Sequence, residues 1–325
     1  MADDEPAPGQ PLRRPADPAD RRLLVAAALV LGCGQPAVKQ PRFDDRPACA
    51  GSYGVLEDAG TLGAGLVEVS GIAASPTTPG LSWMIVDGGQ QPLLFAVRAD
   101  GSVLGRVTIN GATFFDVEDV AAAHCPDGDG FCLFLSDTGD NAHARTDANV
   151  TIVREPAVAL DAGFDARALA PVSRVAIHFP AGEPIDVEAL AVTADGRTLL
   201  LFEKIDGPRA RVFRLAAPFI GDVALMTTLD SPGVGVRWGK AITGADLHPS
   251  GTRLALRVYT GVFEYRFTDV GALGATPPTT VLFGPLTEPQ GEAIAYDGAG
   301  TGLWLASEDP QGATPQILHH LPCGK

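Results

Sequence analysis

The feature that most constrains the fold is an internal repeat, in which a short apolar strand is followed by a turn and then by further apolar strands. Residues 187–201 align without gaps on residues 242–256, and residues 292–300 fit the same frame. Each unit has room for about four strands, which is the pattern of one blade of a β-propeller. Five units share this layout, and their first strands begin at Ser70, Glu118, Glu188, Thr243 and Glu292.

The repeat predicts an all-β fold, a β-propeller of four-stranded blades. The chain has 38 glycines and 27 prolines among 325 residues, a density that favours short strands joined by turns over long helices. Five blades are visible, and there is room for a sixth, degenerate one. The fifth unit has too few residues after Glu308 for a whole blade, so a strand from residues 52–67 is expected to complete it and close the ring. A two-sheet sandwich is the alternative, although it requires no such repeat.

The N-terminal region carries the pattern of an export signal. Two arginines precede an apolar run over residues 23–31, which is shorter than the roughly 20 residues of a membrane-spanning helix. The sequence VLGC at 30–33 resembles a bacterial lipobox, which implies cleavage before Cys33 and lipid attachment to its thiol. The prediction is a lipoprotein signal peptide over residues 1–32, a tether over 33–48 and a single propeller domain over 49–325. An ordinary secretory signal with an incidental cysteine is the alternative.

The remaining cysteines support export. Four are left without Cys33, and an even number in an exported chain predicts two disulfides. Cys125 and Cys132 flank the turn sequence PDGDG, so they can face each other across a hairpin. This pairing leaves Cys49 with Cys323, which would join the two ends of the mature chain. A zinc site is the alternative, but the spacing differs from that of the common zinc fingers. We expect an exported protein, attached to the bacterial cell envelope through its lipid alone.

The charge balance excludes several classes of partner. Lys and Arg number 24 and Asp and Glu number 39, which gives a net charge of −15. Nucleic acids and anionic membrane surfaces bind basic faces, so neither is an expected partner. The sequence has no Gly-x-Ser-x-Gly elbow, no His-Glu-x-x-His motif and no nucleotide-binding glycine loop. No catalytic residue is assigned, and the expected partner is a ligand or another protein of the envelope.

The first strand of each propeller blade lines the central channel, so the five repeat-equivalent residues are expected to converge there. Three of them are carboxylates, and carboxylates brought together repel strongly unless a cation, a proton or a basic side chain compensates. Ligands that offer only oxygen suit Ca²⁺ or Mg²⁺ rather than zinc. The candidate metal ligands, for Ca²⁺, are therefore Glu118, Glu188 and Glu292.

The second strands carry charges near their ends, where a core strand should be apolar. Lys204 and Arg257 are the expected counter-ions of the glutamate ring, because a buried charge is costly unless it is paired. The candidate ligand-binding residues are Asp87, Asp137, Lys204 and Arg257. Three interpretations stay open: a salt-bridge network that fills the channel, a cation site, and a substrate pocket. The segment 137–149 holds further Asp and Asn residues, which suit a Ca²⁺-holding loop or an ordinary polar turn.

Several motifs together resemble a known family. They are VEDVA at 117–121, LSDTGDN at 135–141, DVEAL at 186–190, LALRVY at 254–259 and QGEAI at 290–294. They are similar to the bacterial exported propeller proteins of the phytase-like group, often described by an esterase-like activity of phytase. That resemblance implies a phosphatase or esterase only by analogy of fold. It points to Glu118, Asp137, Glu188, Lys204, Arg257 and Glu292. The chain departs from the family pattern at FFD (114–116) and in the insertion that carries Cys125 and Cys132.

Two functions follow as hypotheses. In the first, a lipid-tethered propeller binds a ligand or a protein partner at its channel face, with a structural Ca²⁺. In the second, the chain is a Ca²⁺-dependent hydrolase in which Lys204 and Arg257 hold an anionic ester or phosphate. The first is favoured, because no general base stands out and a phosphate site should be more basic than this one.

Overall fold

The computed structural model describes residues 49, 52–87, 93–164, 167–230, 241–283, 288, 290–309 and 316–324. All of them belong to one compact unit. The proposed signal peptide, the tether and Cys33 lie outside the described residues. Within these, the only helices are two single 3₁₀ turns, η1 (Pro180–Gly182) and η2 (Val270–Ala272), and neither has the length or the apolar character to cross a membrane.

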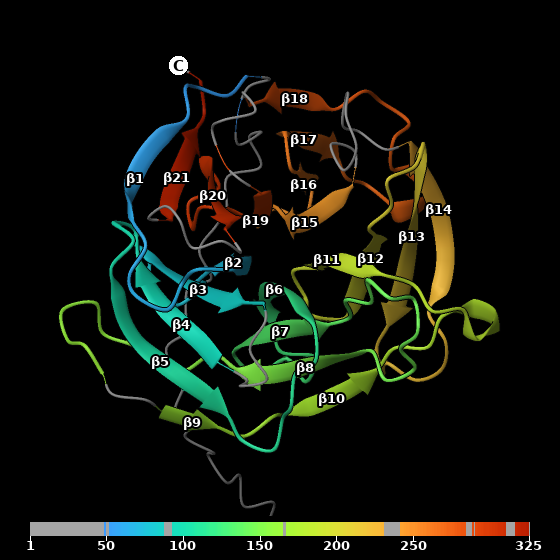
Figure 1. The fold of residues 1–325 in the computed structure, drawn as a ribbon, viewed down its shortest axis with the longest axis horizontal. Coiled ribbons are helices and arrows are strands. Elements are labelled where there is room, and N and C mark those ends of the chain that lie inside the picture. The colour runs from blue at the N-terminus through green and yellow to red at the C-terminus, as the bar shows by residue number, and fades with distance from the viewer. Residues whose placement is uncertain are drawn as a thin grey trace, which may run out of the picture. The chain divides into compact units, whose positions relative to one another are not determined.

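The described strands form five sheets arranged as a ring, a five-bladed β-propeller as the repeat predicts (Figure 1). Blade 1 contains β2 (Val69–Ala74), β3 (Leu81–Val86), β4 (Leu93–Arg98), β5 (Val103–Ile109) and β9 (Arg167–Leu169). Blade 2 contains β6 (Val117–His124), β7 (Phe131–Asp137), β8 (Asn149–Arg154) and β10 (Ser173–Ala176). Blade 3 contains β11 (Val187–Val192), β12 (Thr198–Glu203), β13 (Arg209–Ala216) and β14 (Ala224–Asp230). Blade 4 contains β15 (Ile242–Leu247), β16 (Arg253–Val258), β17 (Gly261–Arg266) and β18 (Thr279–Leu282).

Blade 5 is assembled from both ends of the described chain, as expected. It contains β19 (Gln290–Tyr296), β20 (Gly302–Glu308), β21 (Ile317–Pro322) and β1 (Glu57–Thr61), with β1 antiparallel to β21. The Cys49–Cys323 disulfide lies beside this closure, with its Cα atoms 4.7 Å apart. The second predicted disulfide, Cys125–Cys132, spans the turn between β6 and β7, with a Cα–Cα distance of 4.9 Å. Two disulfides are consistent with an oxidising compartment.

The hydrophobic core is divided into layers between neighbouring blades. One layer joins blades 2 and 3 through Phe134, Leu190 and Phe213, and another joins blades 3 and 4 through Phe202, Leu256 and Phe263. Both faces of a second strand therefore pack against apolar side chains, which explains why β12 is a continuous run of buried residues instead of an alternating pattern. Because each sheet needs its neighbours to bury it, the ring is the stable unit.

One strand was not expected from the sequence. After β8 the chain leaves blade 2, and β9 pairs in parallel with β5 on the outer edge of blade 1. Phe164 lies over Gly105 on the way, where a Cβ on the glycine would approach the Phe164 ring to 2.7 Å. This excursion covers a sheet edge that would otherwise present unpaired backbone groups.

We expect the two disulfides to differ in their contribution to stability. Cys49 and Cys323 are 274 residues apart, whereas Cys125 and Cys132 are 7 apart. Since a cross-link constrains the unfolded chain more when it closes a longer loop, replacing Cys49 and Cys323 by Ser should cost about 4–5 kcal/mol. Replacing Cys125 and Cys132 should cost about 2 kcal/mol. Urea unfolding of the two double variants checks this order, and equal losses would contradict it.

Candidate functional site

The same irregularity recurs near the start of every inner strand. In blade 1, Val69 lies opposite Val86 and Gly71 lies opposite Ile85, so Ser70 between them has no partner and forms a β-bulge. The other four blades show the same shift in register. The bulged residues are the five repeat-equivalent positions, Ser70, Glu118, Glu188, Thr243 and Glu292. A bulge redirects a side chain, which explains polar residues at this place in otherwise apolar strands.

The hydroxyl and carboxyl members of this ring differ in their contacts. Ser70 Oγ donates to the carbonyl of Val117 at 2.9 Å, and Thr243 Oγ1 donates to the carbonyl of Gly291 at 2.8 Å. Each acceptor immediately precedes the bulge of the following blade, so the hydroxyls tie neighbouring blades together. A carboxylate cannot donate such a bond. The three glutamates lie instead along a cavity at the channel.

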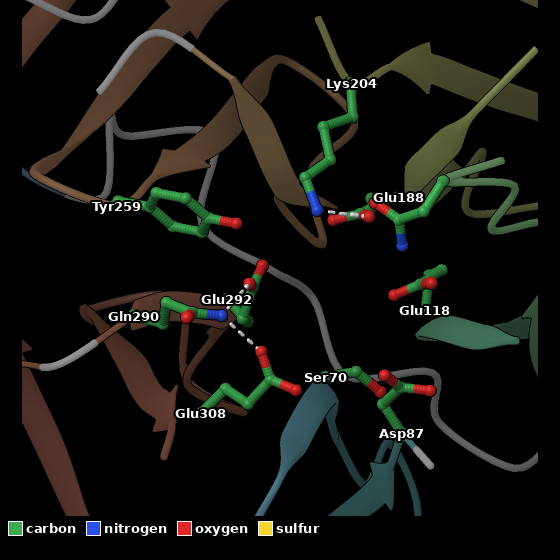
Figure 2. A pocket seen from close by; sticks show the side chains of 10 residues that line it. Ser70, Asp87, Glu118, Glu188, Lys204, Tyr259, Gln290, Glu292 and Glu308 are labelled. Atoms are coloured by element: carbon green, nitrogen blue, oxygen red, sulfur yellow. Dashed lines mark hydrogen bonds and ion pairs between the residues drawn. The ribbon is translucent and has the colours of Figure 1, made fainter. Parts of the chain in front are cut away.

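The cavity has a volume of about 300 Å³ and a polar wall (Figure 2). Within the described part of the chain, it is lined by Ser70, Asp87, Glu118, Asn141, Glu188, Lys204, Tyr259, Gln290, Glu292 and Glu308. Five of these residues carry carboxylates, and Lys204 is the one cation among them. The three glutamates of the ring are between 3% and 7% exposed, so water screens their repulsion poorly.

A second ring of cavity residues comes from the ends of the second strands. In each blade, the inner strand residue just before the bulge pairs with a residue of the second strand. The residue that follows this partner along the second strand belongs to the second ring: Asp87, Thr138, Lys204, Tyr259 and Glu308. Four of the five line the cavity, and Thr138 ties its blade to the next through the carbonyl of Val187 at 2.8 Å. Tyr259 was missed from the sequence, although the 55-residue offset of the repeat aligns it with Lys204.

Lys204 is a counter-ion of the glutamate ring, as the sequence predicts. Its ammonium contacts Glu188 Oε1 and lies 5.9 Å from the centre of the Tyr259 ring. Burial alone would lower the pKa of Lys204, but the carboxylates of Glu188 and Glu292 outweigh it and hold the pKa above its usual value. The ammonium is therefore a fixed positive charge at one side of the cavity.

The single ammonium of Lys204 does not neutralise the other carboxylates of the cavity. Burial, and then repulsion between Glu118 and Glu188, raises the pKa of Glu118 well above its usual value. Burial raises the pKa of Glu292 to about 8, although Lys204 opposes the shift. Burial, and then Asp87, raises the pKa of Glu308 to about 7. The cavity therefore retains protons at neutral pH unless a cation replaces them.

Among the described residues, Asp87, Asp116 and Glu118 form an acidic group in which one carboxylate oxygen of each lies within 4.8 Å of the others. We call it the carboxylate cluster. Burial, and then Asp87, raises the pKa of Asp116 to about 6. Of the three glutamates predicted as metal ligands, only Glu118 belongs to this cluster. Glu188 contacts Lys204, and Glu292 Oε1 accepts a hydrogen bond from Gln290 Nε2 at 3.4 Å.

Arg257 lies outside the cavity lining, although the charge pattern predicts it as a counter-ion of the glutamate ring. Its guanidinium is fully buried, pairs with the carboxylate of Glu288 and lies 5.0 Å from the centre of the Phe283 ring. Burial lowers the pKa of Arg257 to about 9, against the opposing effect of Glu292. Arg257 is the blade-4 equivalent of Ile85, an apolar core position. It does not line the cavity, so its contacts are those of a structural ion pair.

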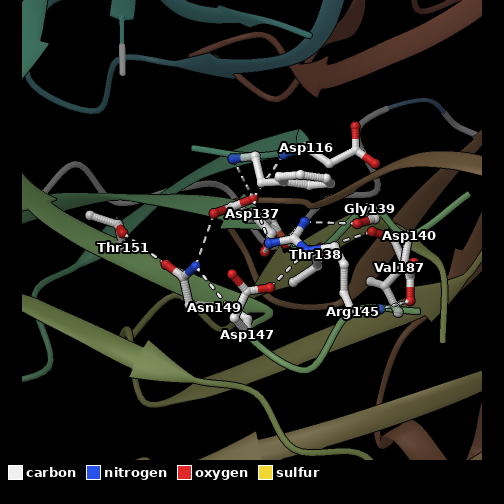
Figure 3. A network of polar contacts seen from close by, with 12 residues as sticks. Asp116, Asp137, Thr138, Gly139, Asp140, Arg145, Asp147, Asn149, Thr151 and Val187 are labelled. Atoms are coloured by element: carbon white, nitrogen blue, oxygen red, sulfur yellow. Dashed lines mark hydrogen bonds and ion pairs between the residues drawn. The ribbon is translucent and has the colours of Figure 1, made fainter. Parts of the chain in front are cut away.

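Asp137 is also outside the cavity lining, whereas Asp87 is part of it. Asp137 is the blade-2 equivalent of Val86, one residue before the cavity position, and adjacent strand residues point to opposite faces. The other acids of this segment already have protein donors. Asp140 accepts from the backbone N–H of Ala144 at 2.8 Å. Asp147 pairs with Arg145 at 3.1 Å (Figure 3). The segment therefore has the contacts of a polar turn.

Comparisons with known proteins place no function on this site. No family model matches the chain, and no curated protein matches it either. Among solved structures, the crystal structure of Chaetomium thermophilum Raptor aligns with 84% of this chain at 11% identity and a TM-score of 0.46. The chain spans about 30% of the length of that Raptor chain. This likeness is too distant to bear on function, and the chain is described by its own architecture as a five-bladed β-propeller with an acidic cavity at the channel.

Proposed function

We propose that this chain is a binding propeller of the bacterial cell envelope, in which the cavity takes a ligand or a protein partner together with a hard divalent cation, Ca²⁺. The observation that carries the proposal is the carboxylate cluster, two of whose members, Asp87 and Glu118, line the cavity of about 300 Å³. Three acids so close together cannot all be ionised without a positive charge between them. Lys204, the cation described in the lining, contacts Glu188, and its charge only partly offsets the raised pKa of Glu118.

The donor set and the space both fit such an ion. Asp87, Asp116 and Glu118 offer carboxylate oxygens, which are the ligands that Ca²⁺ prefers. Gly139 lies against the cluster without a side chain, and a Cβ there would overlap Glu118 Oε1. The bound ion would replace the retained protons and hold the cavity wall in one arrangement.

The localisation in the cell envelope is part of the same proposal. Lipid attachment at Cys33 rests on the VLGC sequence, and export agrees with the two disulfides. The phytase-like assignment rests on the motifs alone. The hydrolase alternative is less favoured, because Arg257 pairs with Glu288 outside the lining and Lys204 contacts Glu188. An anionic phosphate would meet more carboxylates than cations in this cavity.

Replacement of Glu118 by Gln tests the cation site. In calorimetric titrations of the full-length chain, we expect the wild type to bind Ca²⁺ and to melt at a temperature that rises with Ca²⁺ concentration. Glu118→Gln should weaken binding by about 100-fold, because residues that only orient a metal's ligands already contribute 10–100-fold and a direct ligand contributes at least as much. The matched control is Glu308→Gln, which changes a carboxylate of the same cavity outside the cluster and should weaken binding far less. A wild type that neither binds Ca²⁺ nor melts higher with it contradicts the proposal.

A further inference from the structure

The carboxylate of Asp137 is saturated by hydrogen bonds from the protein. Its Oδ1 accepts from the backbone N–H of Phe115 at 3.1 Å, from that of Asp116 at 3.0 Å and from Arg145 Nη2 at 3.0 Å. Its Oδ2 accepts from Asn149 Nδ2 at 3.0 Å (Figure 3). The side chain is 1% exposed, so it has no face left for a ligand. Its role is to hold other groups.

Two of these donors belong to the loop that enters β6, and this loop carries Asp116 into the carboxylate cluster. The Asp116 backbone is held on both sides, because its N–H donates to Asp137 and its carbonyl accepts from the N–H of Gly139 at 3.1 Å. Figure 3 shows the Asp116 carboxylate directed away from Asp137. The anchor therefore fixes the backbone and leaves the side chain for the cluster with Asp87 and Glu118.

Gly139 provides the space for that cluster. A Cβ on Gly139 would overlap Glu118 Oε1 and would lie 2.6 Å from Asp116 Oδ2. Arg145 clamps the segment, since its Nη1 donates to the Gly139 carbonyl at 2.8 Å while its Nη2 donates to Asp137. One short segment thus holds the Asp116 backbone and also forms the wall against which two of the three carboxylates lie.

We propose that Asp137 is a positioning residue, which fixes Asp116 so that the carboxylate cluster is assembled before a cation binds, with Gly139 as the surface that receives the cluster. This inference rests on the proposed cation site. It gives Asp137 and Gly139, which do not line the cavity, a role in setting the affinity of that site for Ca²⁺. Carboxylates in such proximity repel one another, so the loop would relax away from Asp87 and Glu118 without an anchor. Preassembly removes this cost from the binding step.

Asp147 provides a matched control. It pairs with Nε of the same Arg145 at 3.1 Å, but its side chain is 72% exposed, and its contact is with the arginine and not with the Asp116 loop. Asp137→Asn and Asp147→Asn each remove one negative charge beside Arg145. Only the first changes the acceptor of the Phe115 and Asp116 backbone donors.

The first experiment is a calorimetric Ca²⁺ titration of the full-length wild type, Asp137→Asn, Asp147→Asn and Gly139→Ala. Asp137→Asn should weaken Ca²⁺ binding by 10–100-fold, the range found when a partner that orients a metal ligand is changed. Asp147→Asn should stay within about threefold of the wild type, because exposed ion pairs contribute little. Gly139→Ala should weaken binding at least as much as Asp137→Asn while melting close to the wild type, because the free end of Glu118 can move aside. Equal affinities of Asp137→Asn and the wild type would overturn the inference.

The second experiment needs no metal. Amide hydrogen exchange in EDTA should be about tenfold faster at Phe115 and Asp116 in Asp137→Asn, because a charge-assisted bond has become a neutral one. Exchange at the same amides should be unchanged in Asp147→Asn, and unchanged exchange in Asp137→Asn would overturn the inference. A wild type that binds no Ca²⁺ refutes the proposed function, whereas the exchange rates still decide whether Asp137 holds the loop.

Discussion

In EDTA, the titration of Glu292 alone is expected to lower the free energy of unfolding by on the order of 3 kcal/mol between pH 5 and pH 8. Glu292 is 5% exposed, and burial raises its pKa to about 8 from the usual 4.5. Between these two values the folded chain keeps the proton and the unfolded chain has lost it, so a rise in pH favours unfolding. Each such carboxyl contributes about 1.4 kcal/mol per pH unit. Its stabilising contribution is complete below pH 4.5 and is lost as the pH rises through about 8.

Other groups change the size of this slope. The raised pKa values of Glu118 and Glu188, both due first to burial, act in the same direction as that of Glu292. Burial lowers the pKa of His248 and of His319, so these two groups add stability as the pH rises towards 6.5 and oppose the trend. When the wild type is compared with a variant, the contributions of the titrating groups that both proteins share cancel.

Glu292→Gln is that variant, because it keeps the shape of the side chain and removes the titration. Urea unfolding at pH 5, 6, 7 and 8 should give a shallower decline for Glu292→Gln than for the wild type, and a higher stability than the wild type at pH 8. Parallel curves for the two proteins would show that Glu292 does not retain its proton in the folded state. A stability that rises from pH 5 to pH 8 would contradict the whole electrostatic description of the cavity.

Much of the architecture could be predicted from the sequence, because the repeat marks equivalent backbone positions. The ring from Ser70 to Glu292 turns out to be one recurring bulge, and strand β1 closes blade 5 as the short last unit requires. Strand β9 was missed, because three residues in a long connection carry no periodicity that distinguishes them from loop. The repeat shows what is equivalent, and β9 has no equivalent in the other blades.

The site was predicted less completely, for reasons of register. Asp137 and Arg257 stand near the ends of second strands, but a shift of one or two residues decides whether a side chain lies at the cavity, at an anchor or in the core. Asp116 lies in a loop outside the repeat, so no pattern links it to Asp87 and Glu118. Glu288, the partner of Arg257, also lies outside the aligned strands. The inner strands determine where the five bulge residues lie. Loop residues such as Asp116 and Glu288 determine which charges stand next to the acidic and basic side chains of the strands.

The ion pair between Arg257 and Glu288 is a buried contact whose loss should be costly. Arg257→Met is expected to lower the free energy of unfolding by about 3–5 kcal/mol, because it removes the guanidinium that pairs with Glu288, whose side chain is 2% exposed. The imidazole of His319, 3.8 Å from Glu288 Oε1, is a poor substitute, since burial lowers its pKa. The double variant Arg257→Met with Glu288→Leu should recover most of that loss, since apolar side chains of similar volume often replace a buried pair without cost. Urea unfolding measures both, and a double variant as unstable as Arg257→Met would show that the loss comes from packing rather than from an unpaired charge.

The same variant separates the core from the cavity. Arg257 does not line the cavity, so the folded fraction of Arg257→Met should bind Ca²⁺ with nearly the affinity of the wild type, even though the protein is less stable. Lys204→Met should behave in the opposite way. It removes the ammonium that contacts Glu188, so the remaining carboxylates depend more strongly on the added cation, and Ca²⁺ should raise the melting temperature further than in the wild type. Weak Ca²⁺ binding by folded Arg257→Met would place the guanidinium in the electrostatics of the cavity after all, as the charge pattern of the second strands alone suggests.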